Sequence, residues 1–88
     1  MKFYFVYVLL SDTDGRFYIG RSEFVERRFF EHQAGKNIST FRRIPFRLIF
    51  YEAFAAKRDA IRRERYFKTS KGKTTLRQML REFLNTPA

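Results

Sequence analysis

The sequence predicts an α+β domain in which a three-stranded antiparallel sheet is flanked by helices, with the elements in the order ββαβαα. Three observations predict this fold: runs of aromatic and β-branched residues, turn-forming residues between the first two runs, and apolar residues at helical spacing later in the chain. The chain has 88 residues, which fits a single domain spanning residues 1–88.

The first two strands are predicted to form a hairpin. Residues 2–10 are apolar at alternating positions on both faces, as in a central strand that is covered on both sides. "SDTDG" follows as a turn in which Gly15 can take a positive φ, and "RFYIG" returns as the second strand. If Leu10 pairs with Gly15 across a four-residue loop, Tyr7 lies opposite Tyr18 on the same face of the sheet.

A helix is predicted directly after the hairpin. Ser22 is the expected N-cap, and the helix is expected to run to about Ala34, where Gly35 ends it. Arg28 and His32 are four residues apart, so they lie one above the other on one face of this helix.

The second half of the chain supplies one more strand and two helices. "FRLIFYEAF", residues 46–54, has the aromatic and β-branched composition of a strand. Helices are expected over about residues 56–68 and 73–84. The second of these helices is amphipathic, with an apolar stripe of Leu76, Met79, Leu80 and Phe83.

Charge favours a nucleic-acid partner. Nineteen Lys and Arg residues against nine Asp and Glu residues give a formal net charge of +10, and thirteen of the nineteen cations are arginines. The planar guanidinium suits phosphate oxygens, although an acidic membrane surface or an acidic partner protein would also attract such a chain. The sequence has no cysteine, which excludes disulfides, thiolate metal sites and cysteine nucleophiles.

The N-terminal apolar run is not interpreted as a targeting segment. It ends in "SDTDG" without a small-residue cleavage site, and it is too short to span a bilayer. We therefore expect a strand of a cytoplasmic protein and no membrane partner.

Glu64 is the most unusual residue of the expected second helix. It falls on the inward stripe of a helix that is otherwise covered with cations. A buried carboxylate needs compensation, so Glu64 either pairs with an arginine or holds a metal ion. Taken singly, Tyr7 and Tyr18 fit sheet packing, and Arg28 and His32 fit a helix surface.

In combination, these residues resemble the GIY-YIG nuclease superfamily. "FVY", residues 5–7, stands where the family has GIY, with Phe5 in place of the first glycine, and residues 18–20 are "YIG". The resemblance continues through "VERRFFEH" to "AIRRE" and is closest to small stand-alone bacterial members. The positions that match the family's site residues are Tyr7, Tyr18, Arg28, His32 and Glu64.

The resemblance implies a DNA endonuclease that depends on a divalent metal ion, Mg²⁺ or Mn²⁺, and has the same sheet and helices. It implies that Glu64 binds the metal and that Arg28 neutralises the phosphate in the transition state. Tyr7 or Tyr18 would assist deprotonation of the attacking water, and His32 would shuttle a proton or bind the phosphate. No small-molecule cofactor is expected. Many family members also have an asparagine after the glutamate; here only Asn85 follows Glu64, and the role is not transferred to it.

The expected substrate is DNA, recognised by shape in repair or recombination. The cations expected to follow its backbone lie in the loop before the third strand and on the outer face of the second helix: Lys36, Arg42, Arg43, Arg62 and Arg63. Phe41 is either exposed for base stacking or folded under its loop. Two alternatives remain open, namely a nucleic-acid-binding module with little catalysis and a nuclease subunit that needs a protein scaffold.

Overall fold

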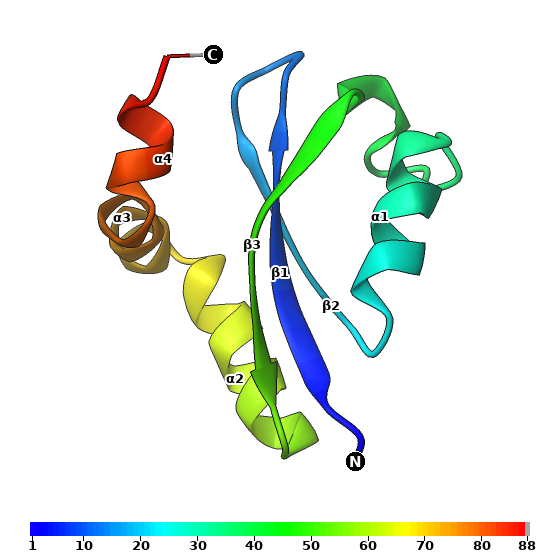
Figure 1. Cartoon of the computed structure of the whole chain (residues 1–88), viewed down its shortest axis with the longest axis vertical. Helices are drawn as coiled ribbons and strands as arrows, with labels where there is room; N and C mark the ends of the chain where they lie inside the picture. The colour runs from blue at the N-terminus through cyan, green and yellow to red at the C-terminus, as the bar shows by residue number, and fades with distance from the viewer. Residues whose placement is uncertain (88) are drawn as a thin grey trace.

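The computed structural model describes residues 1–87 as a three-stranded sheet with helices on both faces (Figure 1). The predicted α+β class and the order ββαβαα are confirmed, except that the last expected helix is divided in two at Leu80. A short 3-10 helix, η1, also precedes the third strand. The elements are β1 (Tyr4–Ser11), β2 (Phe17–Ser22), α1 (Val25–Gln33), η1 (Phe41–Arg43), β3 (Phe46–Phe54), α2 (Lys57–Phe67), α3 (Ser70–Met79) and α4 (Arg81–Asn85).

β1 is the central strand, and it pairs antiparallel with β2 and with β3. The predicted hairpin register was wrong: Leu10 pairs with Phe17, and Tyr7 pairs with Gly20. The loop is longer than expected because the Ser11 hydroxyl accepts hydrogen bonds from the loop's own backbone, including the Thr13 N–H at 3.1 Å. The register differs by two residues, so Tyr7 and Tyr18 still share one face of the sheet.

Alternating residues of β1 pack against different helices. Val6 and Val8 form one part of the core with residues of β2, α2 and α3, whereas Tyr7 and Leu9 form the other part with Val25 of α1. Figure 1 shows the same arrangement, with α1 on one side of the sheet and α2, α3 and α4 on the other. Successive side chains of a strand point to opposite faces of the sheet, so those of β1 and β2 alternate between two separate layers.

The start of α1 differs from the prediction. Ser22 still pairs with Phe5 in the sheet, so the helix begins after Phe24 and not directly after Ser22. The Ser22 hydroxyl accepts a hydrogen bond from the Phe24 N–H at 2.9 Å, which stabilises the connection. The predicted end of the helix is confirmed, because Gly35 has a φ of 74°.

α3 begins earlier than predicted because it starts directly against the end of α2. The Thr69 hydroxyl caps α3 by accepting a hydrogen bond from the Gly72 N–H at 3.0 Å. A Cβ atom at Gly72 would overlap the Tyr66 carbonyl, so only glycine permits this close approach. Of the predicted apolar stripe, Leu76 is buried and Leu80 is partly buried, whereas Met79 and Phe83 are 42% and 40% exposed.

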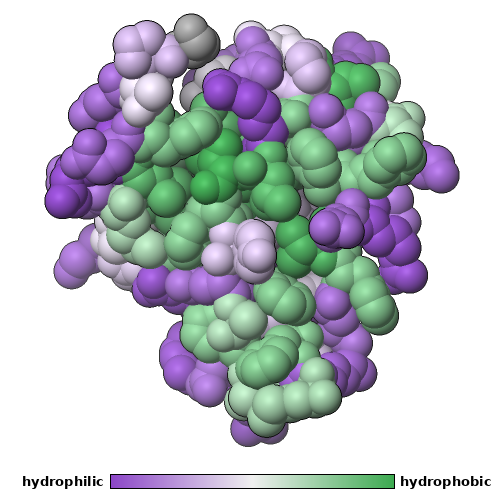
Figure 2. All heavy atoms as spheres, viewed as in Figure 1, coloured by the Kyte–Doolittle hydropathy of each residue, from purple (hydrophilic) through white to green (hydrophobic). Residues whose placement is uncertain are grey.

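The surface is mixed in character. In the view of Figure 2, apolar side chains occupy much of the middle of the face, and hydrophilic side chains predominate along its outer margins. Phe24, Tyr51 and Phe83 are among the large apolar residues that are exposed. Within residues 1–87, no helix has both the length and the apolar character needed to cross a membrane.

Candidate active site

Tyr7 occupies the centre of the site, and its position depends on Gly20. The Tyr7 side chain is 1% exposed, and its ring crosses Gly20, its partner in β2. A Cβ atom at Gly20 would overlap the Cζ and hydroxyl oxygen of Tyr7. The glycine of "YIG" therefore provides the space in which the tyrosine of "FVY" lies.

His32 connects Tyr7 to the loop that follows α1. Its Nε2 is 3.0 Å from the Tyr7 hydroxyl, and its Nδ1 is 2.9 Å from the Thr40 Oγ1. His32 and Thr40 are both buried, so these hydrogen bonds satisfy both nitrogens of the imidazole ring. Thr40 was missed by the sequence analysis, because nothing distinguishes one threonine within a polar loop.

The surroundings of His32 favour its neutral form. Burial lowers the pKa of His32, and the positive charge of Arg28 lowers it further, whereas the negative charge of Glu31 opposes both effects. A neutral imidazole has one N–H donor and one acceptor nitrogen. His32 can therefore accept a hydrogen bond at one nitrogen while it donates at the other.

Tyr18 packs against the same imidazole. Its ring centroid is 4.8 Å from that of His32 and 6.4 Å from that of Tyr7. Tyr18 is only partly buried, in contrast to Tyr7. The structure thus brings the two predicted tyrosines and the predicted histidine together, with Tyr18 nearer to the solvent.

Arg28 and Glu64 act on Tyr7 electrostatically. Burial raises the pKa of Tyr7 well above its usual value, and the charge of Glu64 raises it further, whereas the charge of Arg28 lowers it. Arg28 also donates to the Glu31 carboxylate, with Nη1 2.9 Å from Oε1, and its side chain remains 40% exposed. Both predicted charged residues are therefore within electrostatic reach of the Tyr7 phenol.

Glu64 is paired with two cations. Its Oε1 is 3.3 Å from Nε of Arg21, and its Oε2 is 3.1 Å from Nζ of Lys68. The Glu64 side chain is 18% exposed, which makes this compensation necessary. Arg21 was missed by the sequence analysis, although it alternates with Ile19 and so had to point toward the α2 side of β2.

Glu64 offers a hard divalent cation a single carboxylate. Residues 1–87 contain no group of three His, Cys, Asp or Glu side chains that could enclose a metal ion. Mg²⁺ does not require such a group, since it commonly uses one or two carboxylates together with water and substrate phosphates. Lys68 is 55% exposed and forms an ordinary i,i+4 pair, so its displacement from Oε2 would cost little.

The cations predicted to contact DNA fall into two groups. Lys36 and Arg42 are exposed, and Arg62 is 75% exposed although it pairs with Asp59. Arg42 lies over the ring of Phe41, which is 42% exposed, with 5.3 Å from Cζ to the ring centroid. These side chains can reach a ligand in solvent.

Arg43 and Arg63 have partners within the protein. Arg43 binds Asp14, with Nε 2.7 Å from Oδ2, and thereby connects η1 to the hairpin loop. Arg63 binds Glu52 on β3 and lies over the ring of Phe67 at 4.2 Å. Both guanidinium groups therefore contribute to the folded structure.

Asn85 lies away from Glu64. The neighbouring residues Leu84 and Thr86 line a hollow with Leu10, at the hairpin end of β1. Arg21, the partner of Glu64, pairs with Val6 toward the other end of that strand. Asn85 therefore does not complete the site.

Comparisons with known proteins match most of the chain. The GIY-YIG catalytic domain matches residues 3–78, a span that includes all five predicted site residues. A UPF0213 protein from Lacticaseibacillus paracasei is 46% identical over 68 residues, which cover 76% of this chain and 75% of the relative. A UPF0213 protein from Limosilactobacillus reuteri is 41% identical over 68 residues, covering 74% and 70% of the two chains. The solution NMR structure of a UPF0213 protein from Bacillus halodurans has a TM-score of 0.55 and 36% identity, and the match covers 90% of this chain and 85% of that one.

We expect Gly20→Ala to destabilise the protein by about 2 kcal/mol, because the added methyl group displaces the Tyr7 ring within a packed core. Chemical denaturation of Gly20→Ala, Tyr7→Leu and the double variant would measure the coupling between the two positions. Removal of the ring should relieve most of the cost of Gly20→Ala. An equal cost in both backgrounds would show that Tyr7 is not the cause.

The free energy of unfolding should fall as the pH is lowered below about 6.5, the ordinary pKa of histidine. Above that pH, His32 is neutral in both the folded and unfolded states. Below it, the unfolded chain binds a proton that the folded chain resists, because the pKa of folded His32 is lowered. The loss can reach about 1.4 kcal/mol per pH unit.

Denaturation of the wild type and His32→Asn between pH 8 and pH 5.5 would check this dependence. The variant should be less stable overall but should show a flatter pH profile. Parallel profiles for the two proteins would assign the pH dependence to other groups.

Proposed function

The chain belongs to the family of GIY-YIG catalytic domains, a nuclease family, and from that premise we propose that it is a metal-dependent endonuclease that hydrolyses phosphodiester bonds of DNA. One observation carries the proposal. Tyr7 makes a hydrogen bond to His32, packs near Tyr18, and has its pKa altered by both Arg28 and Glu64. Four residues from three elements, Tyr18, Arg28, His32 and Glu64, thus act on the phenol of Tyr7.

Each of these residues suits one requirement of phosphodiester hydrolysis. Glu64 would hold Mg²⁺ or Mn²⁺, and the bound metal would supply Lewis-acid activation of the phosphate. Arg28 lies at the solvent boundary with a permanent positive charge, so it can neutralise the charge that develops on the phosphate oxygens. The carboxylate of Glu31 orients this guanidinium through the 2.9 Å ion pair.

We assign the proton transfer to Tyr7. The Tyr7 hydroxyl is hydrogen-bonded to Nε2 of His32, and a neutral imidazole nitrogen can accept a proton from it. The raised pKa of Tyr7 disfavours a free phenolate, so the Tyr7 hydroxyl would take a proton from the attacking water only as it passes its own proton to Nε2 of His32. The lowered pKa of His32 opposes this transfer, so the imidazolium would form only while the negatively charged phosphate is bound nearby. Tyr18, which is nearer to the solvent, would position the water or the phosphate.

DNA is the substrate that the charge distribution supports best. The chain has a net charge of +10, and the exposed side chains of Lys36, Arg42 and Arg62 are available to phosphates. A small domain with few exposed recognition elements would select DNA by shape or by nicks and branches. The repair or recombination role, the cytoplasmic location and a protein scaffold stay predictions from the sequence.

A second candidate function rests on the pairing of Glu64. Both carboxylate oxygens bind cations of the protein itself, Arg21 and Lys68. If these ion pairs persist when DNA binds, the protein would be a DNA-binding module with little catalysis, or a subunit that needs a partner to release Glu64. Cleavage by the isolated protein distinguishes this candidate from the first.

Glu64→Gln should reduce Mg²⁺- or Mn²⁺-dependent cleavage of duplex, flapped or branched DNA by at least about 100-fold, because the amide is a poor metal ligand. DNA binding in EDTA should be kept, since the substitution removes a negative charge. Glu82→Gln is the matched control, because the Glu82 side chain is 95% exposed and lies on α4. Cleavage that is equal in all three proteins would refute Glu64 as the metal ligand. Binding without cleavage by the wild type would favour the second candidate.

Tyr7→Phe should lower the cleavage rate by about 100-fold or more, as expected for loss of a group that transfers a proton. Tyr18→Phe should lower it less than about 10-fold, because it keeps the ring that packs against His32. Single-turnover rates of both variants, with thermal unfolding as a control for folding, would measure the difference. The reverse ranking would assign the proton transfer to Tyr18.

A further inference from the structure

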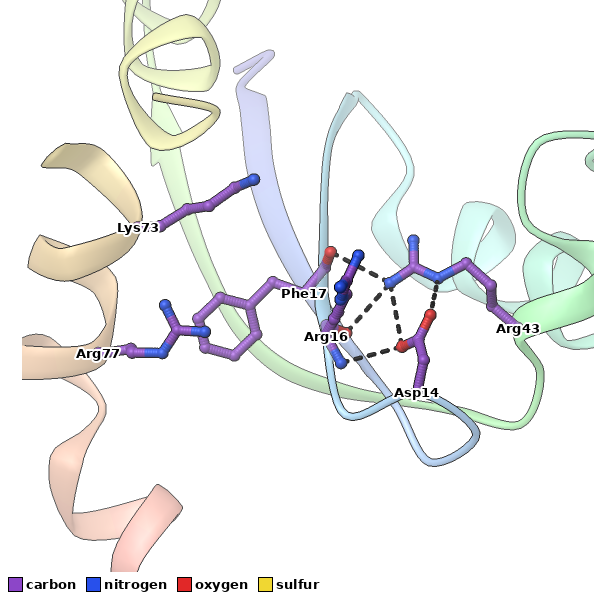
Figure 3. A pocket seen from close by; sticks show the side chains of 6 residues that line it. All are labelled: Asp14, Arg16, Phe17, Arg43, Lys73 and Arg77. Carbon is purple, nitrogen blue, oxygen red and sulfur yellow. Dashed lines mark hydrogen bonds and ion pairs between the residues drawn. The ribbon is translucent and has the colours of Figure 1, made fainter. Parts of the chain in front are cut away.

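A basic pocket opens between the start of β2 and α3, and none of the five proposed catalytic residues lines it. We call it the β2–α3 pocket. Figure 3 shows Arg77 reaching from α3 to the ring of Phe17 at the start of β2, with Lys73 extending from the same helix toward the strands. Its volume is about 480 Å³, and its lining residues are Asp14, Arg16, Phe17, Arg43, Lys73 and Arg77.

The pocket carries an excess of positive charge that the protein does not neutralise. Its one carboxylate, Asp14, is already bound by Arg43, whose hydrogen bond lowers the pKa of Asp14 to about 2. Within residues 1–87, the other cations of the pocket, Arg16, Lys73 and Arg77, have no carboxylate partner. These three cations can therefore bind an anion from solution.

Two of the pocket's cations are oriented by contacts with the fold. The Arg77 guanidinium lies over the ring of Phe17, with 5.2 Å from Cζ to the ring centroid, and that ring packs against the core. Arg43 donates to Asp14 and to the carbonyl oxygens of Arg16 and Phe17, at 3.2 Å and 3.3 Å respectively. The pocket is therefore a shaped site, which suits an anion with several oxygens.

The pocket and Glu64 lie on the same side of the edge strand β2. β2 is at the edge of the sheet, and Phe17 and Arg21 both point toward its α2 side. These residues are four positions apart, which corresponds to about 13 Å along a strand. A polyanionic chain that follows β2 from Glu64 and its partner Arg21 would reach the pocket after a few nucleotides.

We propose that the β2–α3 pocket binds a backbone phosphate of the DNA substrate, a few nucleotides from the phosphate that is cleaved. This inference rests on the proposed function. The pocket would set the register of the DNA strand along β2, so the position of the cleaved bond would depend on the distance between the pocket and Glu64. An acidic protein segment is the competing ligand, and the test below separates the two.

The experiment measures binding of a fluorescent duplex of defined length in EDTA, over a range of salt concentrations. Lys73→Gln/Arg77→Gln should weaken binding about 10-fold and reduce the slope of log K against log salt by nearly 2, as expected when two phosphate contacts are lost. Lys71→Gln/Arg81→Gln is the matched control. It removes the same charge from α3 and α4 at exposed positions outside the pocket, and it should change the slope by less than about 1.

Lys73→Glu serves as a second variant, because it leaves the Arg77–Phe17 contact intact if the double variant fails to fold. Weaker binding by the pocket variants than by the control supports the pocket, whether or not the wild type cleaves DNA. If the pocket variants bind DNA as well as the control variant does, the proposal is overturned, even if cleavage depends on Glu64. Equal binding is also the result expected if the ligand of the pocket is an acidic protein segment. Loss of cleavage in Glu64→Gln tests the proposed function separately.

Discussion

The close approach of Tyr7 to Gly20 across the β1–β2 pair determines the geometry of the whole candidate site. Because Gly20 has no side chain, the Tyr7 ring can lie across the edge strand, and its hydroxyl can reach His32 on α1. The second nitrogen of His32 then binds Thr40, which positions the loop before η1. One missing Cβ atom thus determines where a strand, a helix and a loop meet. A larger residue at position 20 would separate the Tyr7 hydroxyl from Nε2 of His32, even if the sheet kept its register.

β2 is an edge strand, and the side chains on its two faces pack in different layers of the domain. Tyr18 and Gly20 face α1 and the aromatic cluster, whereas Ile19 and Arg21 face α2, where Arg21 binds Glu64. The proposed metal ligand and the proposed proton acceptor therefore lie on opposite layers of the domain. The charge of Glu64 nevertheless raises the pKa of Tyr7. A site at a sheet edge is open to a long substrate, as cleavage within a DNA strand requires.

The sequence alone predicted those features that depend on local pattern. The strand over 46–54, the end of α1 at Gly35 and the shared face of Tyr7 and Tyr18 all follow from periodicity and turn chemistry. It did not predict contacts between residues far apart in the chain, such as Arg21 with Glu64 or His32 with Thr40. The start of α3 was misplaced for the same reason, since the need for glycine at position 72 comes from the carbonyl of Tyr66. Local propensity cannot indicate which polar residue of a loop becomes buried.

The distribution of ion pairs explains how a chain with such an excess of cations remains folded and still presents positive charge to a ligand. Within residues 1–87, eight of the nine carboxylate side chains pair with a cation. The ninth, Glu26, lies in the first turn of α1, where the helix dipole favours a negative charge. Several of these pairs connect separate elements, as Asp14 with Arg43 and Glu52 with Arg63 do. The carboxylates are thus used to hold selected cations in place, and the remaining cations are free to bind phosphate. In the part of the chain that the structure describes, Glu64 differs from the other carboxylates because it pairs with two cations, Arg21 and Lys68. The proposed exchange of Lys68 for a metal ion would leave the ion pair between Glu64 and Arg21 in place.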